Sequence, residues 1–281
     1  MIDHFTYGAL TPLLSFVLSC TGCAVGLSCT GRARVTTGTA RRVWLLLGAA
    51  AIGGTGIWVM HFVAMLGFSV AGAQIHYDVF TTLASMVIAV AVVAAGLFLV
   101  HRPEGRTGSL LAGGMVAGLG VAVMHYLGMA AMHVGVDIAY DPLLVGASVA
   151  VAVVAATAGL WLAARVRGAV AGAAATVVMG LAVSGMHYTG MAAMSVPAYE
   201  AGVLEAGALI GTPAIGLPAT QLLVPLVIGI VTSTVALLVV AGLWPSASEM
   251  EVQAEFDAWA ERQREQQASP RPPRSRTGVA P

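Results

Sequence analysis

Residues 168–194 read GAVAGAAATVVMGLAVSGMHYTGMAAM, an uninterrupted apolar run with His187 near its C-terminal end. A helix of about 20 residues crosses the hydrocarbon core of a bilayer, so this run is long enough to span a membrane. An imidazole inside such a helix is costly unless a metal ion or a hydrogen bond compensates it. The run therefore predicts a membrane helix that carries a functional histidine.

The Met-His block of this run occurs three times in the chain, each time late in a long apolar run. A methionine follows each histidine at a distance of four residues. The copies are Met60-His61-Phe62 with Met65, Met124-His125-Tyr126 with Met129, and Met186-His187-Tyr188 with Met191. Three imidazoles at matched depth in the outer part of the membrane predict one shared site.

The composition is that of a polytopic membrane protein. The chain is 58% hydrophobic and 9% charged, with a mean hydropathy of +0.87, which excludes an ordinary soluble domain. Helices satisfy their own backbone hydrogen bonds in lipid, so we expect an all-α membrane protein. Seven transmembrane helices are predicted, near residues 8–30, 43–68, 79–101, 109–132, 142–164, 168–194 and 219–244.

An internal repeat organises these spans. A Tyr-Ser-Gly-Arg pattern returns at constant spacing in the first, third and fifth spans, and each is followed by a span that ends in a Met-His block. The three copies are Tyr7, Ser15, Gly26 and Arg32; Tyr77, Ser85, Gly96 and Arg102; and Tyr140, Ser148, Gly159 and Arg165. The pattern predicts three parallel two-helix hairpin repeats around a pseudo-threefold axis, plus one extra helix packed outside them.

The loop charges predict the orientation in the membrane. Arginines occupy the first, third and fifth connections, and the other connections carry only acids. The arginines are Arg32, Arg34, Arg41, Arg42, Arg102, Arg106, Arg165 and Arg167; the acids are Asp3, Asp78, Asp137, Asp141, Glu200 and Glu205. The positive-inside rule then places the N-terminus outside and the C-terminus in the cytoplasm.

The chain divides into three parts by composition. Residues 1–245 form the membrane domain, 246–267 read as a cytoplasmic helix, and 268–281 read as a disordered tail. Val252, Phe256 and Trp259 share one face of the cytoplasmic helix, which suits either a cytoplasmic protein partner or the membrane surface. We expect no catalytic domain after the membrane part, no enzymatic activity and no nucleic-acid partner.

The histidines and methionines predict a soft-metal site. Residues four and seven after a histidine share its helical face, which adds Met65, Met129 and Met191, then, with weaker support, Met132 and Met194. Imidazole and thioether together favour copper, Cu(I) above all, while zinc is less favoured because of the methionines. A three-histidine site with an open position could also bind a diatomic ligand. His4, His76 and His133 near the outer surface could help to collect metal, and His133 has the best position.

At these blocks the chain resembles the MHYT family, bacterial integral membrane modules named for Met-His-Tyr-Thr. Met186-His187-Tyr188-Thr189 has the full motif, whereas the second copy has Leu127 and the first has Phe62 and Val63. The resemblance covers about residues 4–245. It implies a sensor in the bacterial inner membrane that binds copper through these blocks and detects O2, CO or NO, often ahead of GGDEF, EAL or kinase domains.

Two other interpretations remain open at this stage. A copper transporter, or a copper donor for assembly of a membrane oxidase, is suggested by the methionine-lined face and by Cys20 and Cys23 deeper in the first helix. The inner halves of the second, fourth and sixth helices are mostly apolar, which favours a site without an onward path. The histidines could also simply bond across helices, and methionine is a common filler of irregular cores.

Overall fold

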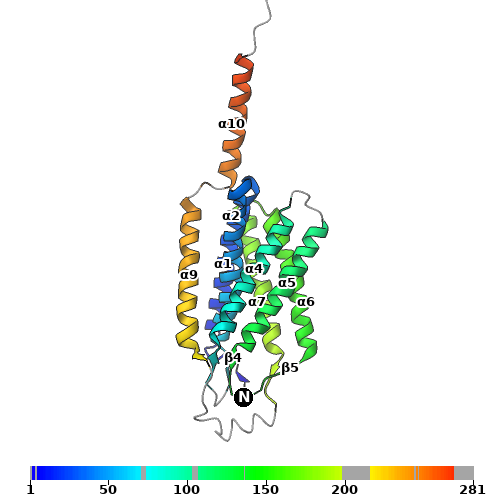
Figure 1. Cartoon of the computed structure of the whole chain (residues 1–281), viewed down its shortest axis with the longest axis vertical. Helices are drawn as coiled ribbons and strands as arrows, with labels where there is room; N and C mark the ends of the chain where they lie inside the picture. The colour runs from blue at the N-terminus through cyan, green and yellow to red at the C-terminus, as the bar shows by residue number, and fades with distance from the viewer. Residues whose placement is uncertain are drawn as a thin grey trace, which may run out of the picture.

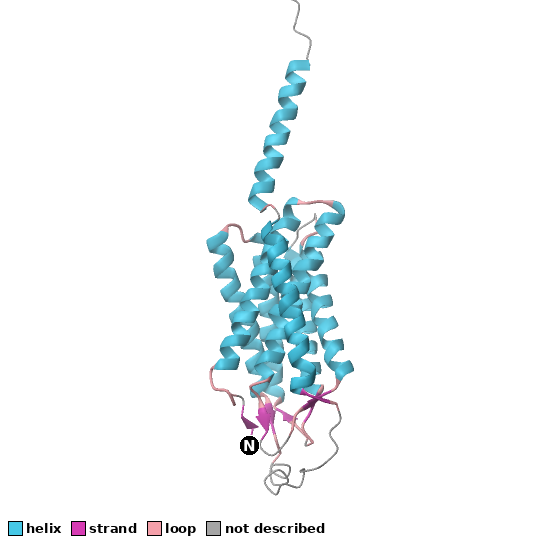
Figure 2. Cartoon of the chain, turned by 90° about the vertical axis from the view of Figure 1, so that its left-hand side faces the viewer, coloured by secondary structure: helices cyan, strands magenta, loops and turns pink. Residues whose placement is uncertain are grey.

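Seven helices of the described chain are long and apolar enough to cross a membrane, and they stand side by side in one upright bundle (Figures 1 and 2). The computed structural model describes residues 2–3, 5–70, 74–102, 107–135, 137–197, 216–243, 245 and 247–268. The helices are α1 (Leu10–Val35), a second span (Gly38–Met65), α4 (Val79–Val100), α5 (Thr107–Ala130), α6 (Pro142–Arg165), α7 (Ala169–Ala192) and α9 (Ala219–Leu243). The predicted class and number of spans are confirmed, with shifts of a few residues at the ends.

The repeat appears as a closed ring of six helices. The hairpin partners are α1 with the second span, α4 with α5, and α6 with α7. Further contacts join the second span to α4, α5 to α6, and α7 back to α1. The helices that carry the Met-His blocks also touch one another inside the ring. Outside it, α9 packs on α1 and the second span, and the hydroxyls of Thr55 and Thr234 hydrogen-bond across that contact.

The second span is the most enclosed and the least regular of the seven. It consists of α2 (Gly38–Ala49), the π-helix η1 (Ala50–Val59) and α3 (Met60–Met65). A π-helical stretch is rare and often marks a functional site. Here it ends at Val59, two residues before His61. A Cβ atom on Gly22 of α1 would collide with the backbone of Gly56, so two glycines allow the backbones of α1 and η1 to touch.

Short two-residue strands, which the sequence did not predict, cap the ends of the hairpins next to the N-terminus. Their bounds are β1 (Ile2–Asp3) with β2 (Ser69–Val70), β3 (His76–Tyr77) with β4 (Met132–His133) and β7 (Leu217–Pro218), and β5 (Ala139–Tyr140) with β6 (Met194–Ser195). Met132 and Met194 therefore lie on strands. The placement of these two residues on the helical face of the histidines was wrong, because α5 ends at Ala130 and α7 at Ala192.

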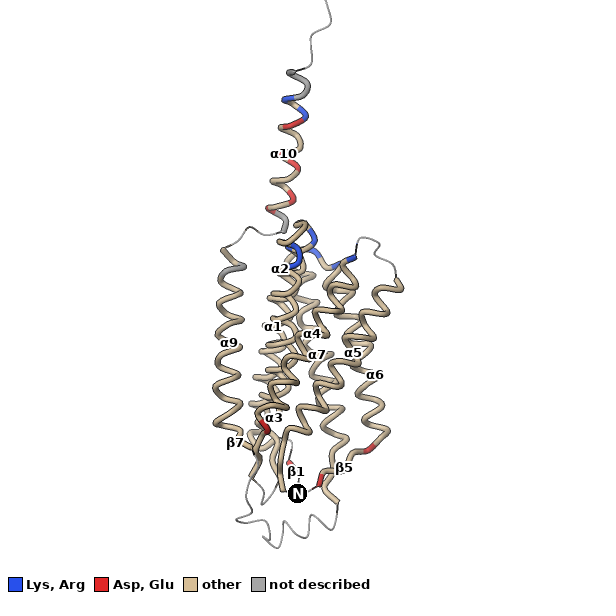
Figure 3. Tube along the Cα trace, in the orientation of Figure 1, with Lys and Arg blue, Asp and Glu red and all other residues tan. Residues whose placement is uncertain are grey.

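Charged residues separate to the two ends of the bundle (Figure 3). The arginines lie at the end from which α10 (Ala247–Ala268) extends, and Asp3, Asp78 and Asp141 lie at the end that holds the N-terminus. The Arg32 guanidinium donates to the carbonyl of Pro245 at 3.2 Å, close to the start of α10. Outside the described residues lie His4, Arg106, Glu200, Glu205 and, apart from Ala268, the tail expected to be disordered.

Candidate metal centre

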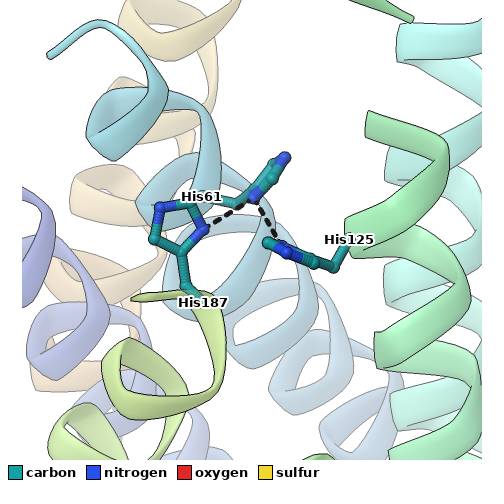
Figure 4. Close-up of side chains that lie close together, drawn as sticks. All are labelled: His61, His125 and His187. Atoms are coloured by element: carbon teal, nitrogen blue, oxygen red, sulfur yellow. Dashed lines mark hydrogen bonds between the residues drawn. The ribbon is translucent and has the colours of Figure 1, made fainter. Parts of the chain in front are cut away.

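Three imidazoles meet inside the bundle, as the matched depth of the three blocks predicts. His61 comes from α3, His125 from α5 and His187 from α7, and their rings converge on one point (Figure 4). The Nδ1 atom of His61 lies 2.9 Å from that of His187 and 3.1 Å from that of His125. One nitrogen atom from each of the three rings lies within 4.8 Å of the corresponding nitrogen atoms of the other two rings. Each histidine is 1% exposed, so the cluster is sealed from solvent.

The hydrogen-bonding needs of the three rings conflict with one another. A neutral imidazole carries a single N–H, and the Nδ1 atom of His61 takes part in both Nδ1–Nδ1 contacts. The Nε2 atoms of His61 and His125 are buried without a hydrogen-bond partner among the described residues. An unmet buried polar group costs about 1–3 kcal/mol. A cation would give the converging Nδ1 lone pairs one common partner and leave the single proton of each ring on Nε2, so the Nδ1 donor set fits a borderline or soft metal ion with an open position.

Glycines on the neighbouring helices leave the space that two of the rings occupy. A Cβ atom on Gly128 would lie 2.6 Å from Nε2 of His61, and one on Gly190 would collide with Nε2 of His125. Each glycine stands three residues after a histidine of its own helix. Sequence reasoning missed this role, although the shared spacing in the second and third blocks was a signal for it.

In the second block, the aromatic residue ties its helix to the next odd-numbered span. The hydroxyl of Tyr126 hydrogen-bonds Ser148 of α6 at 2.6 Å. The first block has Phe62, which has no hydroxyl, and the indole Nε1 of Trp58 donates to Ser85 of α4 at 2.9 Å instead. Trp58 thus replaces the missing tyrosine, a compensation that only the three-dimensional contact reveals.

The predicted sulfur residues divide into two groups. Met65, Met129 and Met191 are all buried, one turn beyond the histidines. Cys20 and Cys23 face different helices: a Cβ atom on Gly180 of α7 would meet the Cys20 sulfur, whereas the Cys23 sulfur lies toward Gly56 of η1. The two cysteines therefore do not converge on the histidine cluster.

An apolar chamber of about 60 Å³ lies on the other side of the imidazoles. Its lining includes Ile57, Val121 and Val183, each of which stands four residues before one of the three histidines. Met186 and Ala152 also line it. Apolar chambers of this kind stay dry and accept small apolar molecules.

Comparison with known proteins identifies the repeat. The chain matches the MHYT family, described as "Bacterial signalling protein N terminal repeat", over residues 54–113, 118–176 and 180–250. Each matched unit contains one of the three histidines. The first two units also contain the hydrogen-bonded pairs Trp58–Ser85 and Tyr126–Ser148. No solved structure matches the chain significantly.

Several curated proteins share this membrane part. MucR of Pseudomonas aeruginosa, a bifunctional diguanylate cyclase/cyclic di-GMP phosphodiesterase, is 37% identical over 187 residues, which are 65% of this chain and 27% of MucR. The signaling protein YkoW of Bacillus subtilis is 32% identical over 157 residues, 56% of this chain and 19% of YkoW. An uncharacterized signaling protein of Caulobacter vibrioides is 36% identical over 155 residues, 55% of this chain and 19% of that protein. The matched region thus spans only a minor part of each relative.

The family match covers more than half of the chain in three successive copies, and each copy begins inside a helix that carries one of the three converging histidines. The chain therefore belongs to the MHYT family, and its membrane part is a signalling module of the kind found in bacterial signalling proteins.

Proposed function

We propose that this module is a copper-binding sensor of the bacterial inner membrane. The convergence of three buried Nδ1 atoms, from His61, His125 and His187, is the observation that supports copper binding most strongly. Met65, Met129 and Met191 would add thioether character, which favours copper over zinc. Among the described residues, the cluster contains three histidines and no carboxylate, the ligand that a hard cation prefers.

The signal that we propose is a diatomic gas, O2, CO or NO, or the redox state of the ion. An ion held by three imidazoles would keep one coordination position open, and a small ligand could bind there. The chamber beneath the rings supports the proposal of a gas as the signal, because its lining is apolar and its volume suits a small molecule. Ile57, Val121 and Val183 would exclude water and direct an apolar ligand toward the imidazoles.

Filling the chamber tests the gas proposal. Ala152→Val adds two methyl groups to the chamber lining, and we expect slower and weaker CO binding by the copper-loaded protein. Ala158→Val is the matched control, because Ala158 lies on the same helix but faces outward and is exposed. Stopped-flow measurement with the protein in nanodiscs compares the two. Equal CO binding by both variants would contradict a role for the chamber.

The output would leave through the arginine end of the bundle. The positive-inside rule places that end in the cytoplasm and the N-terminus outside. There α10 is anchored by the Arg32–Pro245 hydrogen bond and by an exposed ion pair between Arg167 and Glu251 at 3.8 Å. Val252, Phe256 and Trp259 of α10 are exposed, and we propose that they contact a cytoplasmic protein partner.

Substitution of this exposed stripe separates sensing from output. We expect Phe256→Ser with Trp259→Ser to abolish the cellular response to the gas while copper content stays at the wild-type level. Val239→Ser, in the exposed face of α9, is a control for a general effect of added serine. An unchanged response in the stripe variant would contradict output through this surface.

Transport of copper is the less supported alternative. An onward path would need sulfur or polar groups on the cytoplasmic side of the histidines. The chamber in that place is lined mainly by aliphatic residues such as Ile57, Val121 and Leu97, its sulfur atoms are limited to those of Met179 and Met186, and the two nearby cysteines face different helices. This arrangement favours a site that holds its ion.

A further inference from the structure

A second pair of histidines faces each other at the outer end of the bundle. Strands β3 and β4 are antiparallel, and their register places His76 directly opposite His133. Directly opposed residues have Cβ atoms about 4.5–5.5 Å apart and point to the same side of the ladder. Tyr77 and Met132 form the other opposed pair, so the two imidazoles lie on the other face of the ladder, where His76 is 8% exposed and His133 is half-buried.

The His133 ring is held as a metal-binding histidine usually is. Its Nδ1 atom lies 3.1 Å from the carbonyl oxygen of Ala131. A carbonyl can only accept a hydrogen bond, so the proton is on Nδ1 and the lone pair of Nε2 is available. This hydrogen bond from the second ring nitrogen to a backbone carbonyl is the arrangement that orients histidine ligands.

The fold itself does not need this histidine pair. In the third repeat, β5 and β6 form the equivalent ladder, in which Ala139 precedes Tyr140 and Ser195 follows Met194. There the opposed residues are Ala139 and Ser195. The same ladder therefore forms without imidazoles, and the histidines of the second repeat are available for another role.

An open depression lies beside His133 at this end of the bundle. It has a volume of about 540 Å³, and its lining includes His133, Met132, Asp137 and, at its inner side, Met129. Met129 stands four residues after His125 on the same helix. Imidazole and thioether groups thus run from the outer surface toward the three central histidines.

We propose that His76 and His133 form a capture site for a late first-row transition metal ion, which is then passed inward to the central histidines. Binding at the pair stands on its own geometry, whereas the transfer step rests on the proposed function. Two imidazoles on adjacent strands suit Cu²⁺, which heads the affinity order of the divalent ions at nitrogen sites.

The test measures Cu²⁺ binding by electron paramagnetic resonance on the full chain in nanodiscs. His76→Ala with His133→Ser copies the residues of the third ladder and is expected to bind one Cu²⁺ fewer than the wild type. A second variant, Ala139→His with Ser195→His, builds a matching pair on the third ladder and is expected to gain one Cu²⁺. Unchanged stoichiometry in both variants would overturn the capture site, and the gain variant decides alone if the loss variant does not fold.

The transfer step has its own readout. We expect the loss variant to reach the same final copper content at the central histidines, but with an initial loading rate several times lower than the wild type. An equal rate would overturn the transfer. The proposed function fails by a different result, namely His125→Ala retaining its ion, so the two failures are distinguishable.

Discussion

Under the proposed function, replacement of His125 by alanine is expected to abolish copper binding. The substitution deletes one of three converging Nδ1 donors and leaves a space where the ring was, since His125 is buried. Loss of an outer-shell partner already costs a metal site about 10–100-fold in affinity, so loss of a ligand should exceed about 100-fold. Elemental analysis of the purified protein measures this as copper per chain.

A control on the same helix separates ligand loss from general damage. Val123→Ala removes a side chain of α5 that is 55% exposed on the outer face of the bundle. It should keep the full copper content and a similar unfolding temperature. His187→Ala should behave as His125→Ala does. Wild-type copper content in either histidine variant would remove that residue from the proposed ligand set.

The second large effect is expected from a single methyl group. Gly190→Ala places a Cβ atom against Nε2 of His125, so the imidazole must move away from the other two rings. Forcing an extra methyl into a packed interior typically costs about 1–3 kcal/mol. We therefore expect Gly190→Ala to lower both copper content and thermal stability, although every ligand is still present.

Gly185→Ala is the matched control for this variant. Gly185 lies one to two turns earlier on α7, and a Cβ atom there meets nothing within 4 Å. Alanine is preferred over glycine in a helix interior by roughly 0.5–1 kcal/mol, so this variant should be neutral or slightly more stable. The two substitutions are chemically identical and have opposite expected signs. If both leave copper binding unchanged, the glycine at 190 does not position His125.

The sequence predicted the parts of this structure that depend on hydrophobic length and repetition. Seven spans follow from seven long apolar runs, and the ring of hairpins follows from the recurring Tyr-Ser-Gly-Arg pattern. The meeting of His61, His125 and His187 follows from their equal depth in equivalent helices. All three arguments use distances along the chain, which the covalent geometry of a helix converts directly into height in the membrane.

Contacts between helices were not predictable in the same way. Trp58 bonds a serine in the first repeat, as Tyr126 does in the second, and this equivalence depends on which atoms meet across a helix pair. The π-helix η1 lies in an apolar, glycine-rich stretch whose composition suits α-helix equally well. The short strands end the helices before Met132 and Met194, so helical periodicity misplaced those residues. In each case the local sequence pattern allows more than one structure, and a tertiary contact decides which of them forms.

X-ray absorption at the copper edge of the wild-type protein tests the central claim most directly. Coordination by His61, His125 and His187 predicts a first shell dominated by nitrogen at about 2.0 Å, a typical distance for imidazole bound to a first-row ion such as zinc. Multiple scattering from three imidazole rings should accompany it, with a weaker sulfur contribution if the methionines take part. A copper spectrum without imidazole scattering, or copper-free protein after loading, would contradict the account.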